Sequence, residues 1–157
     1  LQVIATDHCS FDFHGDKQNG KDDFTKCPNG APGVETRMPI VFSEGVSKGR
    51  LSLNEFAAVT STNPAKIFGM YPKKGVLAPG SDADIVLMNP DMEVTITKNI
   101  LHENVDYTPY EGIQVKGWPV MTMVRGQAVV ENERLQVPLG FGRYINRKPV
   151  KYTELLK

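Results

Sequence analysis

The chain has 157 residues with as many basic as acidic side chains, 18 of each, so its formal net charge is zero. This balance leaves no basic excess that would argue for binding to nucleic acid or to an anionic membrane, and no apolar run reaches the roughly 18 residues of a transmembrane helix. Hydrophobic residues make up 40% and charged residues 23%, as in soluble globular proteins. The two cysteines, Cys9 and Cys27, lack the Cys-x-x-Cys spacing of a zinc ribbon and fit the reducing cytoplasm.

The first predicted element is a strand over Leu1–Ala5. This short apolar run with β-branched residues is typical of a parallel strand buried on both faces. Such a strand needs neighbours reached through long crossovers, and none precedes it. We therefore expect it to close a (β/α)8 barrel whose other strands lie outside this sequence. Residues Phe11–Gly33, rich in glycine, proline and polar side chains, are predicted to form a long functional loop.

Three helices are predicted after this loop. Apolar residues at helical spacing predict the first over Val34–Lys48. Ser52–Glu55 has the pattern of a capping box and begins the second. Asn63 and Pro64 are predicted to be the N-cap and first residue of a third, short helix that ends at Gly69.

The second half of the chain changes to strand patterns. Ile85–Met88 and Glu93–Thr97 are predicted as two separate strands. Val120–Val124 and Ala128–Glu131 predict a hairpin that turns at Arg125–Gln127. These short antiparallel strands indicate a small β domain.

Two residues stand out as candidates for a functional site. Asp7 follows the predicted barrel strand, where barrel enzymes place catalytic side chains, and it could bind a metal or cap the next turn. Asn29 lies in a Pro-Asn-Gly sequence that, from its residues alone, predicts a turn. For the other candidates an ordinary structural role is the simpler interpretation; these are His8, Cys9, Asp12, His14, Asp22, Asp23, Cys27, Asp82, Asp84 and His102.

Four segments carry a resemblance to a known family. "VIATDHCSF" and "GKDDFTKCPNGAPGVETR" resemble the D-hydantoinase and dihydropyrimidinase family of the cyclic amidohydrolases. "KKGVLAPGSDADIVLMNP" and "VDYTPYEGIQVKGWPVMTMVRGQAVVE" continue the resemblance into the second half. It covers essentially the whole chain, but only the C-terminal part of such an enzyme.

The resemblance implies an α/β fold, namely the C-terminal end of a (β/α)8 TIM-like barrel plus part of a small β-sandwich domain. Residues 1–74 would supply the last barrel strand, the active-site loop and the barrel helices. Residues 75–138 would belong to the β-sandwich, and residues 139–157 would form an extended C-terminal tail.

The resemblance also implies a chemistry. Family members hydrolyse the cyclic amide bond of hydantoins and dihydropyrimidines to N-carbamoyl amino acids, using two divalent metal ions. Zinc suits such a site, and manganese or cobalt would also fit. Asp7 matches the aspartate that ligates one metal and acts as general base, and Asn29 matches the asparagine whose backbone contacts the substrate. The remaining ligands, a His-x-His pair, a carboxylated lysine and two further histidines, lie outside this sequence.

Partners and alternatives follow from the same resemblance. It implies a small cyclic-imide substrate, a homotetramer and a cytoplasmic location, with no nucleic acid and no membrane partner. An allantoinase or dihydroorotase remains an alternative, although there the Asp-His pair is usually followed by Ala-Pro. A non-enzymatic, dihydropyrimidinase-like interaction protein is another, and the presence of Asp7 speaks against it. We expect the isolated chain to be inactive on hydantoins and to fold poorly.

Overall fold

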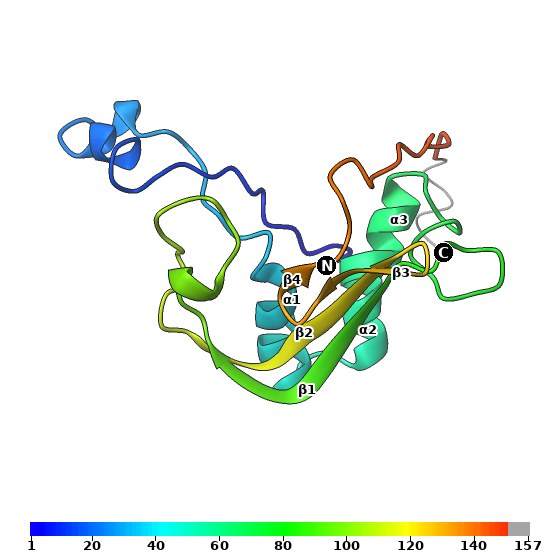
Figure 1. The fold of residues 1–157 in the computed structure, drawn as a ribbon. Helices are drawn as coiled ribbons and strands as arrows, with labels where there is room; N and C mark the ends of the chain where they lie inside the picture. Colours follow the sequence, from blue (N-terminus) through cyan, green and yellow to red (C-terminus); the bar gives the residue numbers. More distant parts are fainter. Residues whose placement is uncertain (151–157) are drawn as a thin grey trace.

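The structure, a computed structural model, describes residues 1–150 of the chain. A twisted sheet lies against three helices, α1 (Arg37–Val41), α2 (Leu53–Ala57) and α3 (Asn63–Ile67), and a long N-terminal loop projects away from both (Figure 1). Among the described residues, no helix has the length and apolar character needed to cross a membrane.

The sheet has four strands in the order β1-β2-β3-β4, and every neighbouring pair is antiparallel. Both of its short connections are two-residue turns whose residues have positive φ, Arg125–Gly126 and Asn132–Glu133. That geometry matches the twist of antiparallel strands. The predicted hairpin is confirmed, whereas its continuation into a fourth strand was not predicted. The strands are β1 (Ile85–Thr95), β2 (Gln114–Val124), β3 (Gln127–Glu131) and β4 (Arg134–Leu135).

The prediction of two separate strands at Ile85–Met88 and Glu93–Thr97 is wrong, because the first segment and Glu93–Thr95 belong to the single strand β1. The pairing with β2 shifts register between Asn89 and Glu93. Here Pro90 has no N–H for the ladder, and the N–H of Asp91 donates to the Asn89 side chain at 3.1 Å. The polar segment therefore interrupts the ladder without reversing the chain.

The helices begin and end close to the predicted residues. α1 continues into the π-helical segment η3 (Phe42–Ser47), so this helical stretch falls inside the predicted Val34–Lys48. Ser52 accepts from the N–H of Glu55, whose carboxylate accepts from the N–H of Ser52, which confirms the capping box.

One helix boundary was predicted wrongly. Asn63 is not an N-cap: its φ of −66° and ψ of −44° are helical, and α2 runs through the π-helical segment η4 (Ala58–Thr62) into α3. Pro64 cannot donate to the preceding turn, and the chain accommodates it by the wider π spacing just before it. The helical stretch then ends at Gly69, as predicted, where φ is +67°.

The core lies between the first helical stretch and β2. Its buried cluster consists of Ile96, Leu101, Val115 and Trp118, with Ile40 of α1 packed against it. Gly117 makes the close approach possible: its φ is +101°, and a Cβ there would lie 2.2 Å from the ring of Phe42.

Leu1–Ala5 forms no strand within residues 1–150, so its place as the closing strand of a barrel whose other strands lie outside this sequence stays a prediction. No strand pairs with it among the described residues, and Leu1 is fully exposed. Its backbone groups bond to helix residues instead: Arg37 donates to Ile4 O at 3.3 Å, and Ile4 N–H donates to Val59 O at 3.2 Å. A strand forms only where another strand pairs with its backbone, and within residues 1–150 the only hydrogen bonds to the backbone of this segment come from helix residues.

The long loop contains two single turns of 3₁₀-helix, η1 (Lys17–Gly20) and η2 (Phe24–Lys26), and no buried core residue in either. A further 3₁₀ turn, η5 (Lys98–Ile100), lies between β1 and β2. Residues 139–150 form no helix or strand, and the rest of the predicted tail lies outside the described residues, so the tail stays a prediction. The division at residues 74 and 138 stays a prediction.

Candidate functional site

Asp7 lies two residues beyond the Leu1–Ala5 segment and is exposed to solvent. Its backbone has a φ of 49°, in the left-handed region that few residues other than glycine adopt, with aspartate and asparagine the commonest among them. Within residues 1–150 its carboxylate accepts no hydrogen bond and forms no ion pair. The structure therefore presents an unpaired carboxylate at the position where the family resemblance implies a metal ligand.

His8, next to this carboxylate, fixes the end of the long loop. Its Nδ1 atom accepts from the backbone N–H groups of Gly33 at 3.1 Å and Val34 at 3.3 Å. Because Nδ1 accepts, the neutral ring carries its proton on Nε2. Glu103 Oε1, 3.7 Å from Nδ1, is too distant for a hydrogen bond to it.

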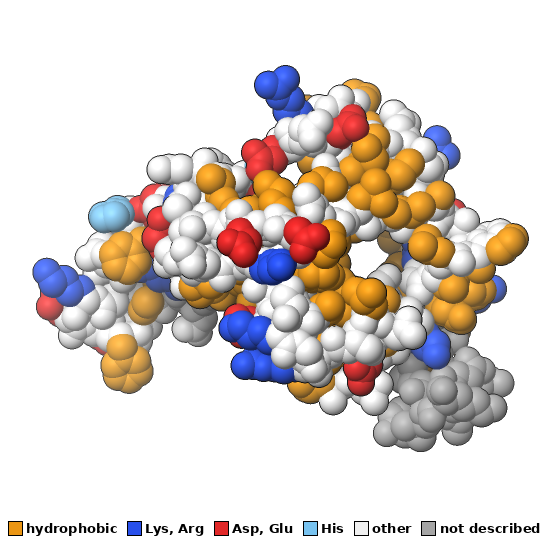
Figure 2. Space-filling view, turned by 90° about the horizontal axis from the view of Figure 1, so that it is seen from below, with side chains coloured by type: hydrophobic (Ala, Val, Ile, Leu, Met, Phe, Trp, Pro, Cys, Tyr) orange, Lys and Arg blue, Asp and Glu red, His pale blue; other side chains and the backbone are white. Residues whose placement is uncertain are grey.

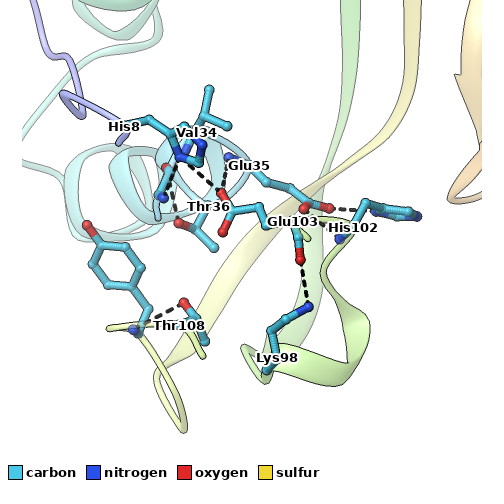
Figure 3. Close-up of polar contacts among 10 residues, drawn as sticks. His8, Val34, Glu35, Thr36, Lys98, His102, Glu103 and Thr108 are labelled. Carbon is cyan, nitrogen blue, oxygen red and sulfur yellow. Dashed lines mark hydrogen bonds and ion pairs between the residues drawn. The ribbon is translucent and has the colours of Figure 1, made fainter. Parts of the chain in front are cut away.

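The residues that follow Gly33 are anchored by a polar network (Figure 3). Thr36, which has no exposed surface, donates its hydroxyl to Gly33 O at 3.2 Å. Glu103 accepts from Glu35 N–H at 3.2 Å, and the Lys98 ammonium donates to the backbone carbonyl of Glu103 at 2.7 Å. These contacts fasten the loop to the start of α1, and the sequence pattern gave no signal for Glu103.

A second contact joins the residues after Asp7 to residues 28–31, named the Asn29 turn after the turn predicted there, although the structure has no hydrogen-bonded turn at these residues. Cys9 N–H donates to Ala31 O at 3.3 Å. Gly30 has a φ of +120°, and a Cβ there would lie 2.3 Å from the carbonyl oxygen of Cys9. Only glycine fits this close approach, so the turn lies directly against the segment that carries Asp7.

Asn29 itself is exposed. Within residues 1–150 its backbone N–H and C=O form no hydrogen bond, so both groups are free to bind a small molecule. The structure thus brings the Asn29 turn beside the segment of Asp7, although the two residues are distant in sequence.

The other two histidines take structural roles, as the simpler interpretation predicted. His14 Nδ1 lies 2.8 Å from Asp106 Oδ2, and the N–H groups of His14 and Phe13 hold the pKa of the Asp106 carboxyl below its usual value. His102 contacts the Glu35 carboxylate at 2.7 Å and Glu133 O at 3.0 Å, and the hydrogen bond with Glu35 raises the pKa of His102. The partners of these two imidazoles are Asp106, Glu35 and Glu133, and Asp7 is not among them.

The pair Asp82 and Asp84 also has a structural role. Both carboxylates bind the ammonium of Lys74, Asp82 at 2.9 Å. Burial lowers the pKa of Lys74, but the hydrogen bonds to Asp84 and Asp82 outweigh it and raise the pKa overall. Asp84 also accepts from Arg125 N–H at 2.9 Å, which fixes the β2–β3 turn.

A metal centre cannot be completed from the described residues, where no group of three or more His, Cys, Asp or Glu side chains converges. Cys9 and Cys27 are free thiols, and the structure does not place them with a histidine as a zinc site. Asp7 therefore offers one ligand only.

Hydrophobic side chains also gather around a hollow on the face shown in Figure 2. A cavity of about 380 Å³ lies between α1 and the sheet, with Met38, Trp118 and Val130 among its lining residues and His102 and Glu35 at its polar side. None of its lining residues belongs to the Asp7 segment or the Asn29 turn. The cavity is thus separate from the candidate site.

Comparisons with known proteins agree with one another. The model of the amidohydrolase family matches residues 1–129. The D-hydantoinase of Geobacillus stearothermophilus is 47% identical over 156 residues, which are 99% of this chain and 33% of that protein. A D-phenylhydantoinase of Escherichia coli O1:K1 is 46% identical over 149 residues, 95% of this chain and 32% of that protein.

Solved structures give the same result. The crystal structure of dihydropyrimidinase from Brevibacillus agri superposes with a TM-score of 0.94 at 51% identity, over 96% of this chain and 33% of that one. A D-hydantoinase structure from a Bacillus species gives a TM-score of 0.93 at 47% identity, again over 96% and 33%. The chain spans about a third of the length of the curated relatives that it matches.

Proposed function

Because this chain belongs to the amidohydrolase family, we propose that it forms part of a metal-dependent enzyme that hydrolyses cyclic amides. The reaction opens the ring of hydantoins and dihydropyrimidines to N-carbamoyl amino acids. The relatives described above are hydantoinases and a dihydropyrimidinase, which favours this reaction over those of allantoinase or dihydroorotase. Since the chain spans about a third of these relatives, the activity is proposed for the intact protein.

The observation that carries the proposal is the state of Asp7. Its carboxylate is exposed and unpaired among the described residues, while its backbone is held in a left-handed conformation. Backbone strain of this kind persists where the surroundings over-determine it, which is common at functional sites. Here His8 and Cys9, the next two residues, are both bonded to the far end of the long loop.

Asp7 fits a metal site as one ligand and not as a complete one. Carboxylate oxygen suits zinc, manganese and cobalt, and two such ions would need further ligands beyond those that residues 1–150 bring together. When bound, the metals would supply an activated water and polarise the substrate carbonyl. We propose zinc as the resident metal.

Asp7 can also move the proton that the reaction requires. Water attacks the ring carbonyl carbon, and the Asp7 carboxylate takes a proton from that water. As the carbon–nitrogen bond of the ring breaks, the proton passes to the leaving nitrogen. Such general acid–base catalysis contributes roughly 10²–10⁴-fold to the rate.

Asn29 is proposed to bind the substrate through its backbone. A cyclic imide presents alternating C=O and N–H groups, and the free N–H and C=O of Asn29 are complementary to them. The contact of Gly30 with Cys9 supports this role, because it fixes the turn against the Asp7 segment.

The assembly of the intact protein is proposed on the same basis. Residues 1–74 would belong to a (β/α)8 barrel and residues 75–138 to a β-sandwich, with the protein a cytoplasmic homotetramer. The free thiols of Cys9 and Cys27 suit a reducing compartment.

The test is ring opening of hydantoin and of dihydrouracil by the intact protein. It is measured as the formation of the N-carbamoyl amino acid. Removal of metal with a chelator should abolish turnover, and zinc, manganese or cobalt should restore it. Turnover that survives complete metal removal, or no ring opening of either substrate by the metal-loaded protein, would contradict the proposal.

A further inference from the structure

Lys17, the first residue of η1, extends its side chain to the backbone carbonyls of the Asn29 turn. Its ammonium donates to the carbonyl of Gly30 at 2.6 Å and also to the carbonyl of Pro28. The same ammonium lies 5.4 Å from the centre of the Phe11 ring, within range of a cation–π contact. The sequence pattern did not mark Lys17, because only the folded loop brings it to this turn.

The two carbonyls that Lys17 binds belong to the peptide groups on either side of Asn29 and Gly30. In a trans peptide the C=O and N–H point in opposite directions. Holding Pro28 O toward the ammonium therefore turns the N–H of Asn29 away from Lys17. Likewise, the hydrogen bond to Gly30 O fixes the orientation of the peptide group between Gly30 and Ala31.

Further contacts fix the position of η1, and so of Lys17, within the loop. The backbone N–H of Lys17 donates to Asp12 O at 3.1 Å. At the other end of η1, a Cβ on Gly20 would lie 2.4 Å from Cys27 Cβ, so η1 packs directly against the residue that precedes Pro28. Lys17 thus connects two parts of one compact loop.

We propose that Lys17 is a positioning residue of the substrate site, which orients the backbone N–H and C=O of Asn29 toward the cyclic imide. The inference rests on the proposed function of Asn29. Lys17 does not touch the reacting atoms; it acts through the two carbonyls. Hydrogen bonds from a charged donor are stronger than neutral ones, which suits a turn that must hold one orientation while it is exposed.

The test compares Lys17→Met with Lys21→Met in the intact protein. Methionine keeps an unbranched side chain and removes the ammonium. Lys21 lies in the same loop, is exposed, and makes no side-chain hydrogen bond within residues 1–150. Lys17→Met should raise KM for hydantoin by roughly 10–100-fold with little change in kcat, and Lys21→Met should leave both constants unchanged.

The KM and kcat values separate positioning from a general structural role. A KM for Lys17→Met within about twofold of the wild type, or a loss confined to kcat, would overturn the inference. If Lys17→Met does not fold, Lys17→Arg decides: its planar guanidinium cannot reproduce the ammonium geometry. A several-fold increase in KM for that variant supports the inference, and a wild-type KM overturns it.

A second measurement distinguishes failure of this inference from failure of the proposed function. Amide hydrogen exchange of Cys9, whose N–H is bonded to Ala31 O, reports on the turn without any turnover. Lys17→Met should accelerate it. Faster exchange in a protein that opens no cyclic amide sinks the proposed function, whereas a wild-type KM in an active protein sinks only the role of Lys17.

Discussion

The Nδ1 atom of His8 accepts a hydrogen bond from the backbone N–H of Gly33 at 3.1 Å, which joins the neighbour of Asp7 to the end of a loop 25 residues later. A second bond, from Val34 N–H, reinforces this joint. The position of the Asp7 carboxylate therefore depends on where the loop returns to α1.

Replacing His8 by leucine should loosen this joint. The N–H groups of Gly33 and Val34 would lose their acceptor, and because the site is only partly buried we expect a loss of about 1 kcal/mol in the free energy of unfolding. His8→Asn should recover part of the loss, since its side-chain oxygen can take the place of Nδ1. Urea denaturation of the three proteins measures this, and equal stabilities for the leucine and asparagine variants would contradict it.

Gly30→Ala should disturb the turn more than its backbone conformation alone requires. Gly15 provides the matched control, because it also has a positive φ, 127°, but a Cβ there would meet nothing within 4 Å. Gly15→Ala should cost about 1–3 kcal/mol from strain only. Gly30→Ala adds a collision with the Cys9 carbonyl and should cost more, as measured by denaturation; equal costs would show that the turn does not lie against Cys9.

The sequence predicted the features that depend on neighbouring residues and missed those that depend on the folded loop. The predicted turn at Arg125–Gln127 and the capping box of Ser52 are confirmed, because both depend on residues only a few positions apart. The contacts of His8 with Gly33, and of Lys17 with the Asn29 turn, join residues that no periodic pattern relates. They exist only once the loop has folded.

The predicted strand at Leu1–Ala5 has no partner strand within residues 1–150, so these residues do not test it. An apolar, β-branched run has the composition of a strand, but pairing depends on what lies beside it. Beside it here lie Arg37, Val59 and Asn63, all from helical segments. By contrast, the two predicted strands after Asp84 are wrong as separate elements: Ile85–Met88 and Glu93–Thr95 merge into β1, because the polar residues between them interrupt the ladder without turning the chain.

Ser52→Ala should destabilise the second helical stretch. The Ser52 hydroxyl accepts from Glu55 N–H at 3.2 Å, and the loss of an N-cap costs about 0.5–2 kcal/mol. Ser61 lies exposed within η4 and makes no side-chain hydrogen bond in residues 1–150, so Ser61→Ala should be neutral or slightly stabilising. Thermal unfolding of both variants tests this, and a Ser61→Ala loss as large as that of Ser52→Ala would contradict the capping role.

The contact of His102 with Glu35 should make stability depend on pH. The hydrogen bond that His102 donates to the Glu35 carboxylate raises the pKa of His102 above its ordinary value of 6.5, so the charged imidazolium is favoured in the folded chain. This contribution is fully present below about pH 6.5 and is lost as the pH rises through the folded-state pKa. Since 61% of the His102 side chain is exposed, we expect it to be worth only about 0.2–1 kcal/mol.

Glu35→Gln measures this contribution, with Glu133→Gln as the control because Glu133 contacts His102 through its backbone carbonyl. The loss of stability in Glu35→Gln relative to the wild type should be larger at about pH 5.5 than at about pH 8.5. Glu133→Gln should show a weaker dependence. A Glu35→Gln effect that is the same at both pH values would contradict the imidazolium–carboxylate contact.

The role of Asp7 is tested most directly by hydantoin ring opening in the intact protein with Asp7→Asn. Asp22→Asn is the matched control, because Asp22 is an exposed carboxylate of the long loop that makes no side-chain hydrogen bond within residues 1–150. Asp7→Asn should lower kcat by at least about 10²-fold while the unfolding transition stays cooperative, and Asp22→Asn should retain normal turnover. Near-normal turnover by Asp7→Asn would contradict the assignment of Asp7 as metal ligand and general base.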